Sequence, residues 1–346
     1  EYTKRVVRDG KYHTGDLGRI NERGRLVLLL RNPEIILLPT GEKISRTVTI
    51  RQISALDGVA ESYVTLYDDK LTAVIDSFGA ELCSVKDASG REYIWTSEDV
   101  WKRHAPLLFP FVCNTASKKY TVNGKEYALS NHGFTRDTDF PTAESTDSAV
   151  ELSYKSDDST KAHYPYDFEF SAKYSLSGSV LSVALTVKNT GSEDMPFFIG
   201  GHPGFLCPFD GEDSTFEDYD VVYEKNETIV QHLADKDITV LENGSKVHVT
   251  RELFANDVFM KDKPASSAVS LVSEKSGRAV TVKYDNSGCI AVWSPYDERG
   301  TFVCLEPWAQ APVYCCDTEE LTKMPHAQHL AAGETYTFKF DIEIKE

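Results

Sequence analysis

The sequence predicts an all-β protein built around a large antiparallel β-sandwich, and three features lead to this prediction. From about Tyr63 onward, short segments of alternating apolar and polar residues are separated by Gly, Asn, Asp and Ser, which is typical of antiparallel strands. Helical patterns are scarce. The strand pattern continues to Glu346, and so many consecutive strands favour two packed sheets over a parallel sheet with crossover helices.

Three segments carry the clearest alternation. In the last one, Tyr336 to Lys345, apolar and polar residues alternate throughout, so one face is expected to be buried and the other to be solvated. The segments Val180 to Lys188 and Phe168 to Leu176 repeat this pattern. In the segment Val180 to Lys188, the residues expected on the buried face are Leu181, Val183, Leu185 and Val187. In Tyr336 to Lys345 they are Phe338, Phe340, Ile342 and Ile344.

The first 61 residues follow a different pattern. Gly-containing turns such as Asp9-Gly and Thr40-Gly-Glu punctuate short hydrophobic runs, as in a small β-meander. The segment Ile50 to Ala60 has apolar residues at helical spacing and predicts a short helix. We therefore expect a small N-terminal piece, residues 1–61, followed by the β-sandwich domain, residues 62–346.

Composition limits the partners and the compartment. The 54 acidic and 37 basic side chains give a formal charge of −17, which disfavours binding to nucleic acid and to anionic membranes. The longest apolar runs are far shorter than the ~20 residues of a membrane span. Seven dispersed cysteines without a CxxC pair are most simply explained by a reducing cytoplasm.

Three segments of the large domain combine a titratable residue with Gly, Pro and aromatic residues. They are Asn131-His-Gly-Phe, Gly200-Gly-His-Pro-Gly-Phe and Cys304-Leu-Glu-Pro-Trp. Each has the form of a strand that ends in a turn, where a rigid sheet commonly presents side chains to a ligand. Each histidine could equally be a turn residue whose ring donates to a backbone carbonyl. Trp293 and Trp308 are compatible with two interpretations, as core residues or as stacking surfaces for a sugar ring.

These segments resemble the galactose mutarotase (aldose 1-epimerase) family, and especially its bacterial aldose-epimerase-like branch. Two further blocks extend the resemblance over the large domain, namely Leu71-Thr-Ala-Val-Ile-Asp-Ser-Phe-Gly-Ala-Glu-Leu and Trp101-Lys-Arg-His-Ala-Pro-Leu-Leu-Phe-Pro. The resemblance implies the family's supersandwich fold and cofactor-free interconversion of α and β anomers of an aldose. It implies Glu306 as general base at the anomeric hydroxyl, His202 as general acid at the ring oxygen, and His132 as a hydrogen-bonding partner of the sugar.

The resemblance is looser at the remaining substrate-binding positions. Asp257 matches a position where the family places an acidic residue against sugar hydroxyls. Where the family commonly carries Gly-Arg, this chain has Cys113-Asn114, and asparagine supplies neither the charge nor the five donors of arginine. Either Arg136 takes over this role, or substrate handling differs and catalysis is weakened or lost.

The N-terminal piece resembles the hinge region of AMP-forming acyl-CoA synthetases and adenylation enzymes. The resemblance lies in Tyr12-His-Thr-Gly-Asp-Leu-Gly-Arg and Leu38-Pro-Thr-Gly-Glu-Lys, and it implies that Asp16 and Arg31 match residues that hold the ribose of an adenylate. The phosphate loop, the acyl-binding domain and the late catalytic lysine of that family are missing from these 346 residues. The piece is therefore interpreted as a relic, a truncated fusion or a boundary inside a larger protein, and alternatively as a partner of separate ligase domains.

The sequence thus predicts a cytoplasmic isomerase that acts on a hexose or related aldose without a cofactor or a metal ion. A non-catalytic carbohydrate-binding or sensing module is the first alternative, and a hexose-6-phosphate 1-epimerase is the second. The second alternative requires cations for the phosphate. The basic residues that could supply them are Arg103, Lys118, Lys119 and Arg136. The particular sugar and the oligomeric state stay open at this point.

Overall fold

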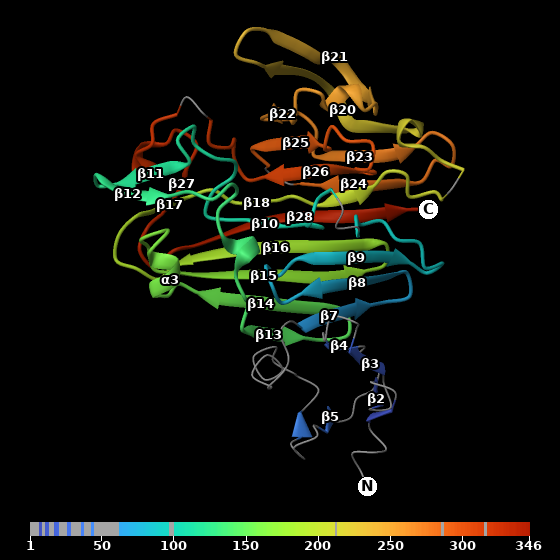
Figure 1. The fold of residues 1–346 in the computed structure, drawn as a ribbon, viewed down its shortest axis with the longest axis horizontal. Coiled ribbons are helices and arrows are strands. Elements are labelled where there is room, and N and C mark those ends of the chain that lie inside the picture. The colour runs from blue at the N-terminus through green and yellow to red at the C-terminus, as the bar shows by residue number, and fades with distance from the viewer. Residues whose placement is uncertain are drawn as a thin grey trace.

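The structure is a computed structural model. It describes residues 62–346 except 97–99, 212, 285–286 and 315–316, together with the backbone of six short strands near the N-terminus. The predicted helix Ile50 to Ala60 and the residues Asp16 and Arg31 lie outside the described residues. In the described part, antiparallel sheets dominate, as the alternation of apolar and polar residues predicts (Figure 1).

The largest sheet has nine strands, all of which pair antiparallel with their neighbours. The hairpin of its last two strands projects from the body at the top of Figure 1. In spatial order the strands are β13 (Thr142–Ser145), β14 (Ala149–Lys155), β15 (Phe168–Ser177), β16 (Val180–Asn189), β28 (Thr335–Lys345), β24 (Ala279–Lys283), β23 (Ala268–Ser273), β20 (Tyr219–His232) and β21 (Asp237–His248).

The alternation predicted for β16 and β28 is confirmed. Leu181, Val183, Leu185 and Val187 are buried on β16, whereas the residues between them are at least partly exposed. On β28, Phe338, Phe340, Ile342 and Ile344 are buried in the same way. The two strands are paired with Leu185 opposite Phe338 and Val183 opposite Phe340, so their apolar faces form one continuous surface.

A second sheet packs against this surface. Its strands are β10 (Leu107–Leu108), β18 (Gly200–Gly201), β26 (Phe302–Trp308), β25 (Cys289–Trp293) and β22 (Phe259–Asp262), with β19 (Gly204–Leu206) also pairing with β26. The packing is close, because a Cβ atom on Gly201 would lie 2.7 Å from the ring of Phe340 on β28. Every residue of β26 is buried, as expected for a central strand that is covered on both faces.

The remaining described strands form a third sheet of seven strands and three two-stranded units. Strands β7 (Ser62–Tyr67), β8 (Leu71–Asp76) and β9 (Leu82–Asp87) continue through β4 (Leu26–Leu28) into the consecutive antiparallel strands β3 (Leu17–Ile20), β2 (Lys11–His13) and β1 (Val7–Arg8), a meander like the one predicted. The two-stranded units are β5 (Ile36–Leu37) with β6 (Lys43–Ile44), β11 (Lys119–Val122) with β12 (Lys125–Ala128), and β17 (Met195–Phe197) with β27 (Gln328–Leu330).

Helices are short in the described part of the chain. They comprise α3 (Asp158–Lys161) and the 3-10 turns η1 (Thr135–Asp137), η2 (Phe216–Asp218), η3 (Glu252–Phe254) and η4 (Leu321–Lys323). Among the described residues, no helix has the length and apolar character needed to cross a membrane.

Candidate active site

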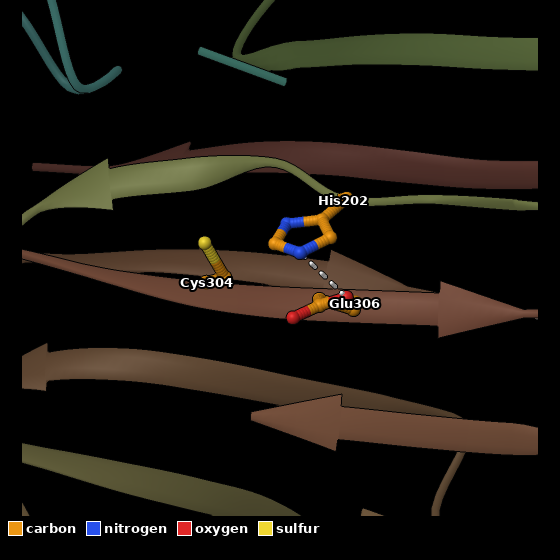
Figure 2. Close-up of side chains that lie close together, drawn as sticks. All are labelled: His202, Cys304 and Glu306. Carbon is orange, nitrogen blue, oxygen red and sulfur yellow. Dashed lines mark ion pairs between the residues drawn. The ribbon is translucent and has the colours of Figure 1, made fainter. Parts of the chain in front are cut away.

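Strand pairing brings His202 and Glu306 together. Gly200 of β18 pairs with Trp308 of β26, and Gly204 of β19 pairs with Cys304. His202 lies midway between the two glycines, and Glu306 lies midway between their partners, so the register places His202 opposite Glu306. Figure 2 shows the imidazole, on the segment that links β18 and β19, facing the carboxylate on β26.

The glycines that flank His202 allow this close approach. A Cβ atom on Gly200 would lie 2.6 Å from Cδ1 of Trp308, and one on Gly204 would lie 2.8 Å from Cζ3 of Trp101. Both distances are shorter than a carbon atom tolerates, so only glycine fits at these positions. The Gly-Gly-His-Pro-Gly motif is therefore a packing requirement that also fixes the position of the histidine.

The His202–Glu306 pair is buried and close enough to exchange a proton. Nε2 of His202 lies 3.2 Å from Oε2 of Glu306, and the two side chains are 9% and 2% exposed. Oε2 has no aligned hydrogen bond within the described residues, which is common in active sites without substrate. Burial raises the pKa of Glu306 well above its usual range, and the charge of Asp257 raises this pKa further. Burial lowers the pKa of His202 to about 3.

His132 lies beside this pair in a defined tautomer. Its ring is 5.5 Å from the ring of His202, centroid to centroid, and nearly perpendicular to it. The backbone N–H of Cys113 donates to Nδ1 of His132 at 3.1 Å, so the proton of the neutral ring is on Nε2. Burial lowers the pKa of His132 well below 6.5, and the charges of His202 and Arg136 lower it further. His132 therefore offers a neutral N–H donor.

The backbone around His132 is unusual and is held by close packing. His132 and Cys113 both have positive φ, 62° and 63°, which non-glycine residues rarely adopt. Gly133, with φ +75°, packs so closely against Phe109 that a Cβ atom would lie 2.3 Å from the carbonyl oxygen of Phe109. Strained backbone conformations of this kind concentrate at functional sites, where the surrounding structure stabilises them.

Arg136 and Asn114 are the two residues that could replace the arginine expected from the resemblance. After burial, which is the larger cause, the charge of Arg136 also lowers the pKa of both His132 and His202. Its Nε is 3.8 Å from Asp137 and has no hydrogen bond within the described residues. Asn114 is half-buried, and its buried Oδ1 also has no hydrogen-bond partner among the described residues.

Two half-buried tryptophans and an exposed acid surround His202. The ring centroid of His202 is 5.1 Å from that of Trp101 and 5.8 Å from that of Trp293. The indole Nε1 of Trp293 donates to Oδ1 of Asp257 at 2.7 Å, and Asp257 holds a positive φ of 69°. Asp257, expected only on a loose match, thus lies next to the pair and is fixed by a hydrogen bond.

Of the two interpretations of Trp308, core residue or stacking surface in the sugar site, the structure favours the core. Its side chain is 1% exposed and belongs to the hydrophobic core. It packs against Gly200, so it presents no open face for a sugar ring. Aromatic surface near His202 comes instead from Trp293, the other tryptophan with two interpretations, and from Trp101, whose role the sequence did not reveal.

A buried carboxylate holds the segment that carries Trp101. Oε1 of Glu81 accepts the backbone N–H groups of His104 at 2.6 Å and Ala105 at 3.0 Å. The same segment bonds to the His202 loop, because the carbonyl of Pro106 accepts the N–H of His202 at 3.1 Å. Glu81 occurs in the Phe-Gly-Ala-Glu-Leu block of the family resemblance, and this is the only signal in the sequence that could have identified it.

The residues considered for phosphate binding are divided between two places. Arg103 forms an ion pair with Asp137 and donates to the carbonyl of Arg136 at 2.8 Å. Lys118 and Lys119 are exposed at the start of the β11–β12 hairpin, where Lys119 pairs with Glu126 at 2.7 Å. Within the described residues, only the arginines are tied to the His132 and His202 site.

The fold, together with comparison to known proteins, defines the class of this protein as a β-sandwich of the carbohydrate-epimerase type. The model of the aldose 1-epimerase family matches residues 62–343. The chain therefore belongs to the aldose 1-epimerase family.

Its relatives are distant but cover the same region. The plasmid-encoded protein LacX of Lactococcus lactis subsp. lactis is 28% identical over 299 residues, which are 81% of this chain and 99% of LacX. A galactose mutarotase related enzyme from Lactobacillus acidophilus has a similar structure, with TM-score 0.77, 29% identity, and coverage of 82% of this chain and 97% of that one. A galactose mutarotase-like protein from Lactobacillus casei gives TM-score 0.74, 26% identity, and coverage of 82% and 99%.

Proposed function

We propose that this protein is a cofactor-free mutarotase that interconverts the α and β anomers of an aldose through the His202–Glu306 pair. The observation that carries the proposal is the 3.2 Å contact between Nε2 and Oε2 in a buried site. In a cyclic sugar the anomeric hydroxyl and the ring oxygen are bonded to the same carbon. A base for one and an acid for the other must therefore lie side by side, as these two groups do.

In the proposed reaction, Glu306 removes the proton from the anomeric hydroxyl O1. The C1–O1 double bond forms while the bond from C1 to the ring oxygen breaks, and His202 gives its proton to the ring oxygen. The open-chain aldehyde then rotates about the bond to C1. Ring closure on the other face returns one proton to His202 and one to O1, so the enzyme is unchanged.

The electrostatics of the site support these roles. A raised pKa makes ionised Glu306 a stronger base, and a lowered pKa makes protonated His202 a stronger acid. Burial favours the resting pair with one proton and no net charge. Transfer of that proton from Oε2 to Nε2 produces the reactive carboxylate and imidazolium without uptake of a proton from solvent.

The neighbouring residues would bind and orient the sugar. The Nε2–H of His132 and the guanidinium of Arg136 would donate to sugar oxygens, and Asp257 and Asn114 would accept from hydroxyls. Trp101 and Trp293 would provide apolar surface for one face of the ring. The pKa shifts attributed to Arg136 support its assignment as the replacement for the arginine of the resemblance.

The test is polarimetry or NMR exchange on freshly dissolved α-glucose and α-galactose. The wild-type chain should accelerate anomer equilibration, and Glu306→Gln should lose this acceleration by about 10²-fold or more, because the amide cannot accept the proton. Glu151→Gln, at an exposed position of β14, is the matched control and should retain full activity. Saturable sugar binding without acceleration by the wild-type chain would instead identify a carbohydrate-binding module, the alternative that Asn114 motivates.

One observation favours a phosphorylated sugar as a second candidate substrate. Arg103 donates to the backbone carbonyl of Arg136 at 2.8 Å, so two arginines lie side by side, and burial together with the charge of Arg103 lowers the pKa of Arg136. A terminal phosphate could accept from both. If glucose 6-phosphate is the substrate, kcat/KM should exceed that for glucose, and Arg136→Ala should remove the preference. If Arg136→Ala lowers kcat/KM equally for glucose and glucose 6-phosphate, Arg136 binds a sugar hydroxyl and not the phosphate.

A further inference from the structure

We propose that His202, Cys304 and Glu306 form a binding site for a soft divalent ion of the Zn²⁺ type, and that the bound ion turns the active site off. One ligand atom from each residue lies within 4.8 Å of the other two, and all three residues are buried. Cys304 and Glu306 are two residues apart on β26, so their side chains share one face of the strand. Figure 2 shows His202 above that face, with the sulfur of Cys304 directed to the same side.

The distances suit a tetrahedral ion. Bonds of about 2.0–2.1 Å to nitrogen and oxygen place two ligand atoms of a tetrahedron about 3.3 Å apart. The measured separation of Nε2 and Oε2 is 3.2 Å. The sulfur need move closer by no more than about an ångström, because it lies within 4.8 Å of the other ligand atoms and a bond of about 2.3 Å to sulfur places it roughly 3.6 Å from them. Rotation of the Cys304 side chain about χ1 supplies such a movement.

The ligand set determines which ion would bind. A thiolate and a carboxylate together neutralise a doubly charged ion, which a buried site requires. Imidazole and thiolate favour zinc, cobalt and copper over magnesium and calcium. Oε2 of Glu306 is buried and has no aligned hydrogen bond within the described residues, so an acceptor in the centre of the group is available. Three protein ligands leave a fourth position open to water.

A second group of possible metal ligands differs from this site in one respect, the presence of a lysine. Asp220, His248 and Glu274 also come within ligand distance of one another. There, however, the ammonium of Lys246 lies 2.5 Å from Asp220 and 2.9 Å from Glu274, and it already supplies the positive charge. No cation is placed among His202, Cys304 and Glu306 in the described part of the chain.

Metal binding would exclude catalysis. The thiol of Cys304 and the carboxyl group of Glu306 would each release a proton to solvent as the ion binds, and the lone pairs of His202 and Glu306 would be donated to the ion. Neither residue could then hold or accept the proton that mutarotation requires. This consequence rests on the proposed function, whereas metal binding itself does not.

Direct binding can be measured with Co²⁺ and Zn²⁺ on the reduced 346-residue chain. We expect one Co²⁺ per chain, with the near-ultraviolet charge-transfer absorption of a cobalt–thiolate bond and the visible bands of a tetrahedral ion. Cys304→Ser should abolish the charge-transfer band and weaken binding by about 10²-fold or more. Cys207→Ser removes another fully buried thiol, outside the site, and is the control that should bind normally. Binding that is absent, or unchanged in Cys304→Ser, would overturn the proposal.

Activity provides the second readout. Zn²⁺ should inhibit mutarotation by the wild-type chain, and Cys304→Ser should keep its basal rate and lose its sensitivity to Zn²⁺. The two proposals fail in different ways. Cobalt bound through Cys304 in a chain without mutarotase activity would leave the metal site standing and overturn the proposed function. Mutarotation that depends on Glu306 but is insensitive to bound Zn²⁺ would overturn the inhibitory role.

Discussion

The backbone N–H of Cys113 donates to Nδ1 of His132 at 3.1 Å, and the backbone N–H of His132 donates to the carbonyl of Cys113 at 3.2 Å. This reciprocal pair joins two segments that are separated by 19 positions in the sequence. Both residues have positive φ, so the contact is maintained against a backbone preference. The consequence is a histidine whose tautomer is set by the main chain.

His132 should therefore remain neutral and protonated at Nε2 through the physiological range. Its pKa lies well below 6.5, so ¹⁵N NMR of the imidazole should show no titration between about pH 5.5 and 8. His132→Phe should lower kcat/KM roughly tenfold to a hundredfold, the loss expected for one strong hydrogen bond in the transition state. His232→Phe, at an exposed position of the β20–β21 hairpin, should have no effect. Normal activity of His132→Phe would exclude the proposed donor role.

The pH–rate profile should report on the proton shared by His202 and Glu306. Activity is lost at low pH when the pair gains a second proton, and at high pH when it loses its last one. The lowered pKa of His202, about 3, moves the acidic limb below that of an ordinary histidine. The raised pKa of Glu306 moves the alkaline limb above that of an ordinary carboxyl group.

Asp257→Asn should shift only the alkaline limb, and toward lower pH. The negative charge of Asp257 raises the pKa of Glu306, so its removal stabilises the ionised carboxylate and the last proton leaves earlier. The profile of kcat for the variant, compared with that of Asp237→Asn on the exposed hairpin, measures this shift. An alkaline limb that moves to higher pH would contradict the assignment.

Glu81 is expected to contribute to stability through two backbone hydrogen bonds. Glu81→Ala leaves the N–H groups of His104 and Ala105 without their acceptor and should lower the free energy of unfolding by about 2 to 4 kcal/mol. Glu81→Gln should cost less than about 1 kcal/mol, because both bonds end on one oxygen and an amide oxygen can accept them. Urea unfolding of the two variants measures the difference. Similar losses in both would indicate that the charge of Glu81 matters instead.

Trp293 is expected to contribute to substrate binding, and Trp308 to the stability of the fold. Trp293→Ala should raise KM about two- to tenfold with little change in stability, because one stacking contact is removed from a half-buried side chain. Trp308→Ala should lower the free energy of unfolding by about 3 to 5 kcal/mol, since a fully buried indole leaves a cavity. Thermal melting and substrate titration of both variants separate these effects. A KM effect confined to Trp308→Ala would restore that residue to the sugar site.

The alternation of apolar and polar residues made the nine-stranded sheet predictable, whereas it gives no information on β26, the central strand of the second sheet. On β28 one face is solvated, so apolar and polar residues alternate visibly. Every residue of β26 is buried, so the sequence does not separate Glu306, which faces His202, from Trp308, which lies in the core. The family resemblance indicated His132, His202 and Glu306, and the structure brings these three residues together.

The residues that the sequence analysis missed depend on long-range contacts. Trp101 lies beside His202, and Glu81, twenty positions earlier, holds the residues just after Trp101 by accepting the backbone N–H groups of His104 and Ala105. Cys304 lies near His202 and Glu306 because β18 and β19 pair with β26 in one particular register. Neither relationship leaves a local pattern in the sequence. The period of two along β26 could have indicated that Cys304 and Glu306 share a face, although not that His202 lies opposite them.

The central claim is that His202 and Glu306 act as one proton-sharing unit, and a double-mutant cycle tests it most directly. Anomer exchange of the preferred sugar would be measured by NMR for wild type, His202→Asn, Glu306→Gln and the double variant, with thermal melting to verify folding. For a unit, the double variant should be about as slow as the slower single variant, because either change already removes proton transfer. Losses that multiply in the double variant would show that the two residues act independently and would contradict the account.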